Sequence, residues 1–151
     1  MKKLIKIGLV LSFTFYVFIL TILLFFSGRN NGWMADLTFL EYIKYSSNFV
    51  PFKTISTYIN AIFSGNMNLD IPLKNLFGNL LMFLPMGIYL PYFIKRLKRI
   101  SSFSVTFMII LLVIEITQSI SRRGSFDIDD FILNTIGALI GFEVWKKFFR
   151  R

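Results

Sequence analysis

A run of 20 residues without a charged side chain, from residue 7 to residue 26, constrains this chain more than any other feature. About 20 apolar residues form a helix long enough to cross the roughly 30 Å hydrocarbon layer of a bilayer. The apolar part of a cleaved signal peptide usually has only about 7–15 residues, and no A-x-A cleavage site follows this run. We therefore predict a retained membrane anchor, although Lys2, Lys3 and Lys6 would also suit a signal peptide.

Three further stretches of similar length and apolar character follow. Helices are the expected form, because backbone polar groups in hydrocarbon need partners within their own segment. Pro85 should kink the first of the three. The sequence thus predicts an all-α, polytopic membrane protein with a single membrane domain, residues 1–151. Its four transmembrane helices would cover residues 7–26, 76–94, 103–120 and 128–148.

The predicted external loop, 27–75, should contain short helices of its own. Residues 54–63 place Ile55, Tyr58, Ile59, Ile62 and Phe63 on one helical face. This pattern is typical of an interfacial helix that lies on the membrane or caps the bundle. Residues 36–45 suggest a second short helix, and residues 48–52 should be extended before Pro51.

The charge distribution indicates the membrane orientation. The formal net charge is +9, from 17 basic and 8 acidic residues, and the pI near 10 would ordinarily suggest a nucleic-acid partner. Eleven of the 17 basic residues lie in the N-terminal tail, the 95–99 turn and the C-terminal end, which four spans would place on one side. The positive-inside rule then puts both termini in the cytoplasm. Topology explains the pI, and no nucleic-acid partner is predicted.

Polar residues recur at one depth near the outer ends of the last three predicted spans. At about 1.5 Å per residue, Asn79, Glu115 and Asn134 would all lie roughly 6–8 Å below the outer boundary. A charge at mid-membrane costs about 2.5–3.5 kcal/mol, so an intramembrane Glu115 invites a functional hypothesis. Arg122, Arg123 and Lys74 would lie just above. The predicted binding residues are Asn75, Asn79, Glu115, Gln118, Arg123, Asp127, Asp130 and Asn134.

Several of these residues also have purely structural explanations. Asp127 or Asp130 could simply cap the last helix, on which they share a face with Asn134 while Asp129 lies opposite. Gly137 and Gly141 favour close helix packing. The amides and Glu115 could serve only as hydrogen bonds between helices.

No metal site and no cofactor are predicted. The carboxylates of Asp127, Asp130 and Glu115 are the oxygen ligands that magnesium or calcium prefers, but their spacing is not that of an EF-hand loop. The sequence has no histidine and no cysteine, which excludes thiolate nucleophiles, Cys/His zinc sites and Ser-His-Asp catalysis.

Three motifs resemble those of the VanZ-like family of small bacterial membrane proteins, over residues 48 to about 145. They are Asn48-Phe-Val-Pro51-Phe52; Asn79-x5-Pro85-x-Gly87; and Glu115-x-x-Gln118 followed by Arg123, Phe126-Asp127-Ile128-Asp129-Asp130 and Asn134-x-x-Gly137. The resemblance implies a four-helix protein of a Gram-positive-type cell membrane. It also implies an association with decreased susceptibility to teicoplanin, a lipid-tailed glycopeptide antibiotic.

Two functions remain open at this point. The first is a non-enzymatic pocket in the outer leaflet that binds an envelope lipid, a lipid-linked cell-wall precursor or a lipoglycopeptide, and so affects glycopeptide susceptibility. The alternative is an intramembrane enzyme that uses Glu115 or Asp127 as acid or base on a phospholipid or polyprenyl-linked substrate. A small transporter or an assembly partner is less favoured, because no charged residue continues the path to the cytoplasmic side.

Overall fold

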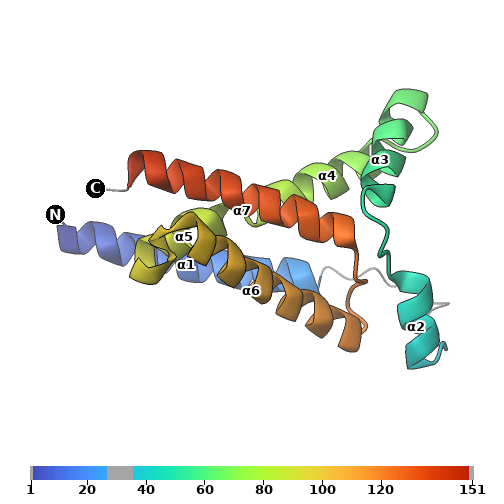
Figure 1. Cartoon of the computed structure of the whole chain (residues 1–151), viewed down its shortest axis with the longest axis horizontal. Helices are drawn as coiled ribbons and strands as arrows, with labels where there is room; N and C mark the ends of the chain where they lie inside the picture. The colour runs from blue at the N-terminus through green and yellow to red at the C-terminus, as the bar shows by residue number, and fades with distance from the viewer. Residues whose placement is uncertain (1, 27–35, 150–151) are drawn as a thin grey trace.

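The computed structural model describes residues 2–26 and 36–149, and helices joined by short turns make up most of these ranges (Figure 1). No β-strand forms in the described ranges; a single isolated parallel bridge joins Asn48 and Asp127. The predicted all-α class is therefore confirmed. The elements are α1 (Lys2–Phe25), α2 (Phe39–Ser46), α3 (Lys53–Ser64), α4 (Asp70–Met82), α5 (Leu84–Phe93), the 3-10 turn η2 (Lys95–Lys98), α6 (Ile100–Ile120) and α7 (Ile128–Phe148).

The long helices run alongside one another, and the short ones gather at one end. Figure 1 shows α1, α5, α6 and α7 as a bundle, with α2, α3 and the start of α4 at its right-hand end. The first turn of α1 and the last turn of α7 lie at the opposite end. Residues 27–35 of the predicted external loop lie outside the described part of the chain.

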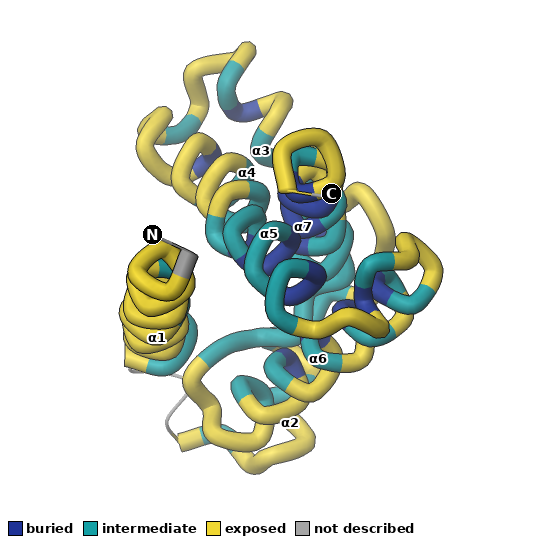
Figure 2. Tube along the Cα trace, turned by 90° about the vertical axis from the view of Figure 1, so that its left-hand side faces the viewer, coloured by how far each residue is buried: buried dark blue, intermediate teal, exposed yellow. Residues whose placement is uncertain are grey.

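In the described part of the chain, three segments are long and apolar enough to cross a membrane, by length and composition: Lys3–Phe25, Asp70–Phe93 and Ile100–Ile120. Their apolar side chains are largely exposed, as expected for surfaces in contact with lipid; Phe15 and Phe18 of α1 are 67% and 61% exposed (Figure 2). The fold therefore fits a membrane protein. α7 matches α6 in length, at 21 residues each, but has charged residues near both ends and is not among the three.

The second of these segments begins earlier than predicted and is broken. Its first helix, α4, starts at Asp70 rather than at residue 76, and the helix is interrupted at Phe83 before α5 begins. Pro85 explains the break, since proline has no N–H to continue the ladder and its ring crowds the preceding turn. The predicted kink is thus a break between two helices.

Three glycines allow α7 to lie directly on the backbone of α4 and α5. A Cβ atom at Gly137 would overlap the carbonyl group of Leu80, and one at Gly141 would overlap that of Leu84. From the other side, a Cβ at Gly87 would overlap the backbone of Ala138. Small residues permit this close approach between membrane helices. The prediction that Gly137 and Gly141 serve close packing is confirmed.

Aromatic rings fill the core between α5, α6 and α7. Phe83, Phe103, Phe107, Phe142 and Trp145 are all at most 1% exposed. The rings of Phe103 and Phe142 lie 4.9 Å apart, and Phe83 meets Phe107 edge to face at 5.7 Å, both favourable arrangements for aromatic pairs. This core fixes α6 against the α5–α7 pair.

The two predicted short helices are both present as helices. α2 begins with a capping box, in which the N–H of Glu41 donates to the Thr38 hydroxyl and the N–H of Thr38 donates to the Glu41 carboxylate. The Thr38 hydroxyl also donates to this carboxylate, and the hydrogen bonds from Thr38 hold the pKa of Glu41 below its usual value. α3 covers the predicted 54–63 stretch and ends at Ser64; the next residue, Gly65, has a φ of +67°, which suits glycine. Ile55, Tyr58 and Ile62 of its apolar face are half-buried, whereas Phe63 is 86% exposed.

Replacing Gly137 or Gly141 with leucine should disrupt the bundle, because the new side chain would meet a neighbouring backbone. We expect each variant to lose at least about 3 kcal/mol of stability. The melting temperature in detergent and the abundance in membranes should both fall. Gly8→Leu is the matched control, since a Cβ there meets nothing within 4 Å. An unchanged melting temperature for Gly141→Leu would contradict the packing account.

Candidate ligand-binding site

Asp129 is a completely buried carboxylate that holds the start of α3. Its Oδ1 accepts a hydrogen bond from the N–H of Phe52 at 2.5 Å. Its Oδ2 accepts from the N–H groups of Thr54 and Ile55, at 2.7 and 3.1 Å. These donors belong to the first turn of α3, where N–H groups lack helical partners and the helix dipole favours a negative charge. Asp129 therefore caps α3 from the start of α7.

Asp127 reinforces the same junction. Its Oδ1 accepts from the N–H of Asp129 at 2.9 Å, which caps α7, and from Nδ2 of Asn48 at 3.0 Å. Its Oδ2 accepts from Oγ1 of Thr54 at 2.7 Å. Backbone hydrogen bonds from Asn48 N–H to Phe126 and from Ile128 N–H to Asn48 complete the contact. We call residues 48–55 together with Asp127 and Asp129 the α3–α7 clamp.

The clamp holds one residue in a strained conformation. Phe52 has a φ of +64°, a left-handed conformation that bulky residues rarely adopt. The hydrogen bond from its N–H to Asp129 and the cap that follows stabilise this turn.

The clamp corrects the sequence prediction for Asp127. Asp127 was expected to share one face with Asp130 and Asn134, but α7 begins at Ile128, so Asp127 precedes the helix and turns towards Asn48. The simpler explanation, helix capping, holds for Asp127. The sequence analysis did not predict that Asp129 contacts residues 52–55. The available signal was the presence of two polar motifs, Asn48-x-x-Pro51-Phe52 and Phe126-Asp127-Ile128-Asp129-Asp130, that could pair with each other.

A cavity of about 620 Å³ lies between α1, α4, α6 and α7, next to the clamp. Apolar residues of α1 and α4 form one part of its lining, and polar residues form the other. Of the eight predicted binding residues, all except Asp127 line it. Its polar and charged lining residues are Lys74, Asn75, Asn79, Glu115, Gln118, Arg123, Ser125, Asp130 and Asn134.

Some of these side chains are occupied by neighbours. Asn79 donates from Nδ2 to Oδ1 of Asp130, which joins α4 to α7. Gln118 donates from Nε2 to the carbonyl of Leu24 at 2.8 Å, which joins α6 to the end of α1.

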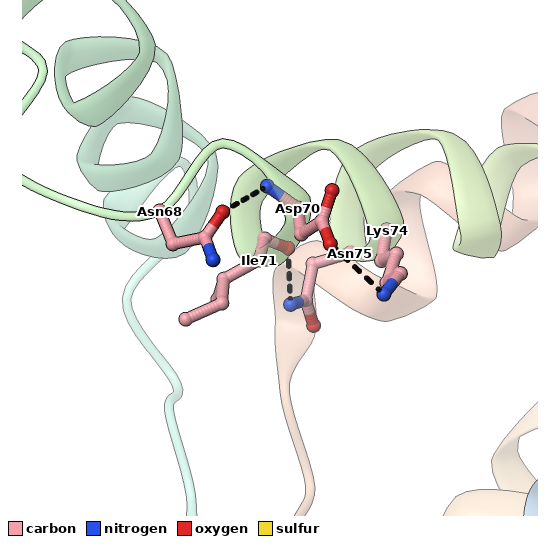
Figure 3. Close-up of polar contacts among 5 residues, drawn as sticks. All are labelled: Asn68, Asp70, Ile71, Lys74 and Asn75. Carbon is pink, nitrogen blue, oxygen red and sulfur yellow. Dashed lines mark hydrogen bonds and ion pairs between the residues drawn. The ribbon is translucent and has the colours of Figure 1, made fainter.

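Polar side chains at the start of α4 bind to other groups of the same helix (Figure 3). Asn75 donates to the carbonyl of Ile71 in its own helix at 2.8 Å, and Lys74 pairs with Asp70 at 3.5 Å. Both members of the ion pair are largely exposed, so it contributes little to stability. Asn75 and Lys74 thus form the edge of the cavity rather than its floor.

Two deeply buried groups of the cavity lack partners among the described residues. Glu115 is 5% exposed, and no hydrogen bond or ion pair from a described residue reaches its carboxylate. Asn134 is 3% exposed, and its Oδ1 accepts no hydrogen bond. A buried polar atom left unpaired costs about 1–3 kcal/mol, so native proteins rarely keep one without a reason. We define Glu115 and Asn134 as the floor of the cavity.

The two arginines after α6 have different surroundings. Arg123 is exposed and lines the cavity with Lys74. Arg122 lies over the ring of Tyr42 at 5.5 Å, and the hydroxyl of Tyr42 donates to the carbonyl of Gly124 at 2.7 Å. These contacts attach α2 to the α6–α7 turn. In residues 2–26 and 36–149, no three acidic, histidine or cysteine side chains are grouped so as to hold a metal ion.

Removing the Asp129 carboxylate should loosen the clamp. Asp129→Ala leaves three backbone N–H groups of residues 52–55 without their acceptor, so we expect a loss of about 3 kcal/mol. The melting temperature should fall, and limited proteolysis should cut within residues 48–55. Asp70→Ala is the control, because its exposed ion pair with Lys74 is worth less than about 1 kcal/mol. Equal melting temperatures for the two variants would contradict the clamp.

Comparison with known proteins identifies one family, VanZ/LLP1, which matches residues 13–150. No curated protein and no solved structure matches the chain significantly. The family match includes most of α1, which carries none of the motifs, and continues through the clamp, the cavity and α7. The chain belongs to the VanZ/LLP1 family.

Proposed function

We propose that the protein spans a bacterial cell membrane four times, with both termini in the cytoplasm. The basic η2 turn and the end of α7 lie together, with Nζ of Lys98 6.0 Å from the ring centre of Trp145. The first turn of α1 is at the same end of the bundle (Figure 1). A cytoplasmic location for this basic end follows the positive-inside rule.

The opposite end of the bundle would then meet the outer leaflet. Phe49, Phe52 and Phe63, in and around α3, are each more than 60% exposed. Large apolar side chains beside an amphipathic helix are typical of a segment that lies in the membrane interface. This supports an interfacial position for α3, and with it the proposal that the cavity lies at the level of the outer leaflet.

We propose that this cavity binds an amphiphile of the cell envelope. The observation that carries the proposal is that Glu115 and Asn134 are buried at a cavity of about 620 Å³, where Oδ1 of Asn134 has no hydrogen-bond partner among the described residues. Ligand sites characteristically combine an apolar lining with a few polar groups that converge. A headgroup that donates hydrogen bonds would satisfy the floor.

The remaining lining suits an acyl chain. Leu23 and Leu24 of α1 and Leu81 and Met82 of α4 all line the cavity. α1 packs against α5 through aromatic rings, with the ring centres of Phe13 and Tyr16 5.0 and 5.9 Å from that of Tyr89. Its hydrogen bonds to α4 and α5 run from Tyr16 to the Met82 carbonyl and from Tyr89 to Ser12. An acyl chain in the cavity would therefore lie beside these contacts, against the leucines near the end of α1.

Family membership narrows the biological setting. The VanZ family is linked to glycopeptide resistance. The candidate ligands are therefore an envelope lipid, a lipid-linked cell-wall precursor, or a lipid-tailed glycopeptide of the teicoplanin type. Occupancy of the cavity would alter how the drug reaches its precursor target.

Binding is favoured over catalysis. The enzyme alternative relied on Glu115 or Asp127, but Asp127 does not line the cavity and its carboxylate is engaged by Asn48, Thr54 and the N–H of Asp129. Of the two proposed acid–base residues, Glu115 lines the cavity and Asp127 does not, so the enzyme alternative loses one of its two candidates.

Filling the cavity tests the proposal. Gly78 lines the cavity and a Cβ there meets nothing within 4 Å, so Gly78→Leu should occupy the space without disturbing the packing. We expect normal abundance, loss of the co-purifying lipid in mass spectrometry, and loss of any effect on teicoplanin susceptibility. Gly8→Leu, on the exposed face of α1, is the control. Unchanged lipid content and unchanged susceptibility in Gly78→Leu would overturn the proposal.

A further inference from the structure

The charges of the cavity are separated by depth. Of the described residues that line it, the basic ones are Lys74 and Arg123, and both are exposed at the edge. Its two carboxylates lie further in: Glu115 is buried, and Asp130 is half-buried. Neither Lys74 nor Arg123 forms an ion pair with Glu115 among the described contacts. The cavity therefore has basic side chains at its edge and acidic side chains in its interior.

The floor offers hydrogen-bond acceptors, and no described residue places a cation at it. Glu115 offers two carboxylate oxygens and Asn134 offers Oδ1. Asp130, whose Oδ1 accepts from Asn79, adds negative charge close by. A buried carboxylate without a positive partner is costly. The group that best compensates for it is one that both carries a positive charge and donates several hydrogen bonds.

A primary ammonium group meets both requirements. It has three donors and a full charge, whereas a hydroxyl has one donor and no charge. Hydrogen bonds between ions are roughly twice as strong as those between neutral groups. At the edge of the cavity, Arg123 and Lys74 would suit the phosphate or carboxylate of the same ligand, with Arg123 able to bind it in a bidentate manner.

We propose that the cavity selects amphiphiles with a primary ammonium group, bound at Glu115 and Asn134, and with an acidic group held at Arg123 and Lys74. This inference rests on the proposed binding function and specifies its ligand class. An aminophospholipid and an acylated peptide with a free amine both have this chemistry.

The test uses the full chain in detergent micelles and three phospholipids of equal chain length. Phosphatidylethanolamine has the ammonium group, its N-acetyl derivative keeps the phosphate but loses the charge, and phosphatidylglycerol carries hydroxyls instead. Titration followed by native mass spectrometry should show phosphatidylethanolamine binding at least about tenfold more tightly than the other two. A palmitoylated lysine peptide and its N-acetylated form repeat the comparison. The tighter of the two ammonium probes identifies the natural source.

Two variants connect the preference to the cavity. Glu115→Gln keeps the shape and removes the charge, so the preference for phosphatidylethanolamine should disappear while phosphatidylglycerol binding changes by less than about twofold. Asn134→Asp replaces the amide of the floor with a carboxylate of nearly equal size, so the floor would then have two carboxylates. This variant should strengthen the preference for phosphatidylethanolamine, and it provides a test if Glu115→Gln proves unstable. Gly78→Leu should abolish binding of every probe.

The possible results separate the two proposals. Equal binding of ammonium and non-ammonium probes, abolished by Gly78→Leu, would overturn the ammonium preference and leave the amphiphile-binding function intact. Binding of all probes that is insensitive to Gly78→Leu would overturn both. A preference that persists in Glu115→Gln would show that the ammonium group does not lie at Glu115, and would also overturn the inference.

Discussion

The backbone contact between α7 and the α4–α5 pair is the interaction on which the rest of the structure depends. Gly137 lies against the carbonyl of Leu80, which immediately follows Asn79, and Asn134 lies one turn before Gly137 on the same helix. The contact therefore brings α4 and α7 close enough for Asn79 to donate to Asp130. Without three glycines in register, the polar residues of different helices would not line one cavity.

The outer end of the bundle depends on α7 in a second way. Its start supplies Asp127 and Asp129, whose carboxylates fix residues 48–55 and cap α3. The same short motif continues into Asp130, which turns to the cavity instead. Neighbouring acidic residues thus have different roles: some hold the clamp together and one lines the candidate site. The reason is that successive residues of a helix that begins at Ile128 point in different directions.

Much of the fold could be predicted from the sequence, because apolar length and helical periodicity are local properties. The apolar helices, α3, the effect of Pro85 and the glycine packing all follow from such patterns. Long-range pairing could not be predicted in this way: the contacts of Asp129 with Phe52, Thr54 and Ile55 join residues more than 70 positions apart. The shared depth of the polar residues in the predicted spans indicated which of them would line a site with Glu115. It could not show that Asp130 lines the cavity while Asp127 does not, because that depends on where α7 begins.

The central claim is that an amphiphile lies in the cavity between α1, α4, α6 and α7. Photoaffinity labelling in membranes, with an aminophospholipid that carries a diazirine on its acyl chain, tests this most directly. The account predicts adducts concentrated on Leu23, Leu24, Leu81 and Met82, which line the cavity, and their disappearance in Gly78→Leu. Adducts spread evenly over the exposed apolar faces of α1 and α6, and unchanged by Gly78→Leu, would contradict it.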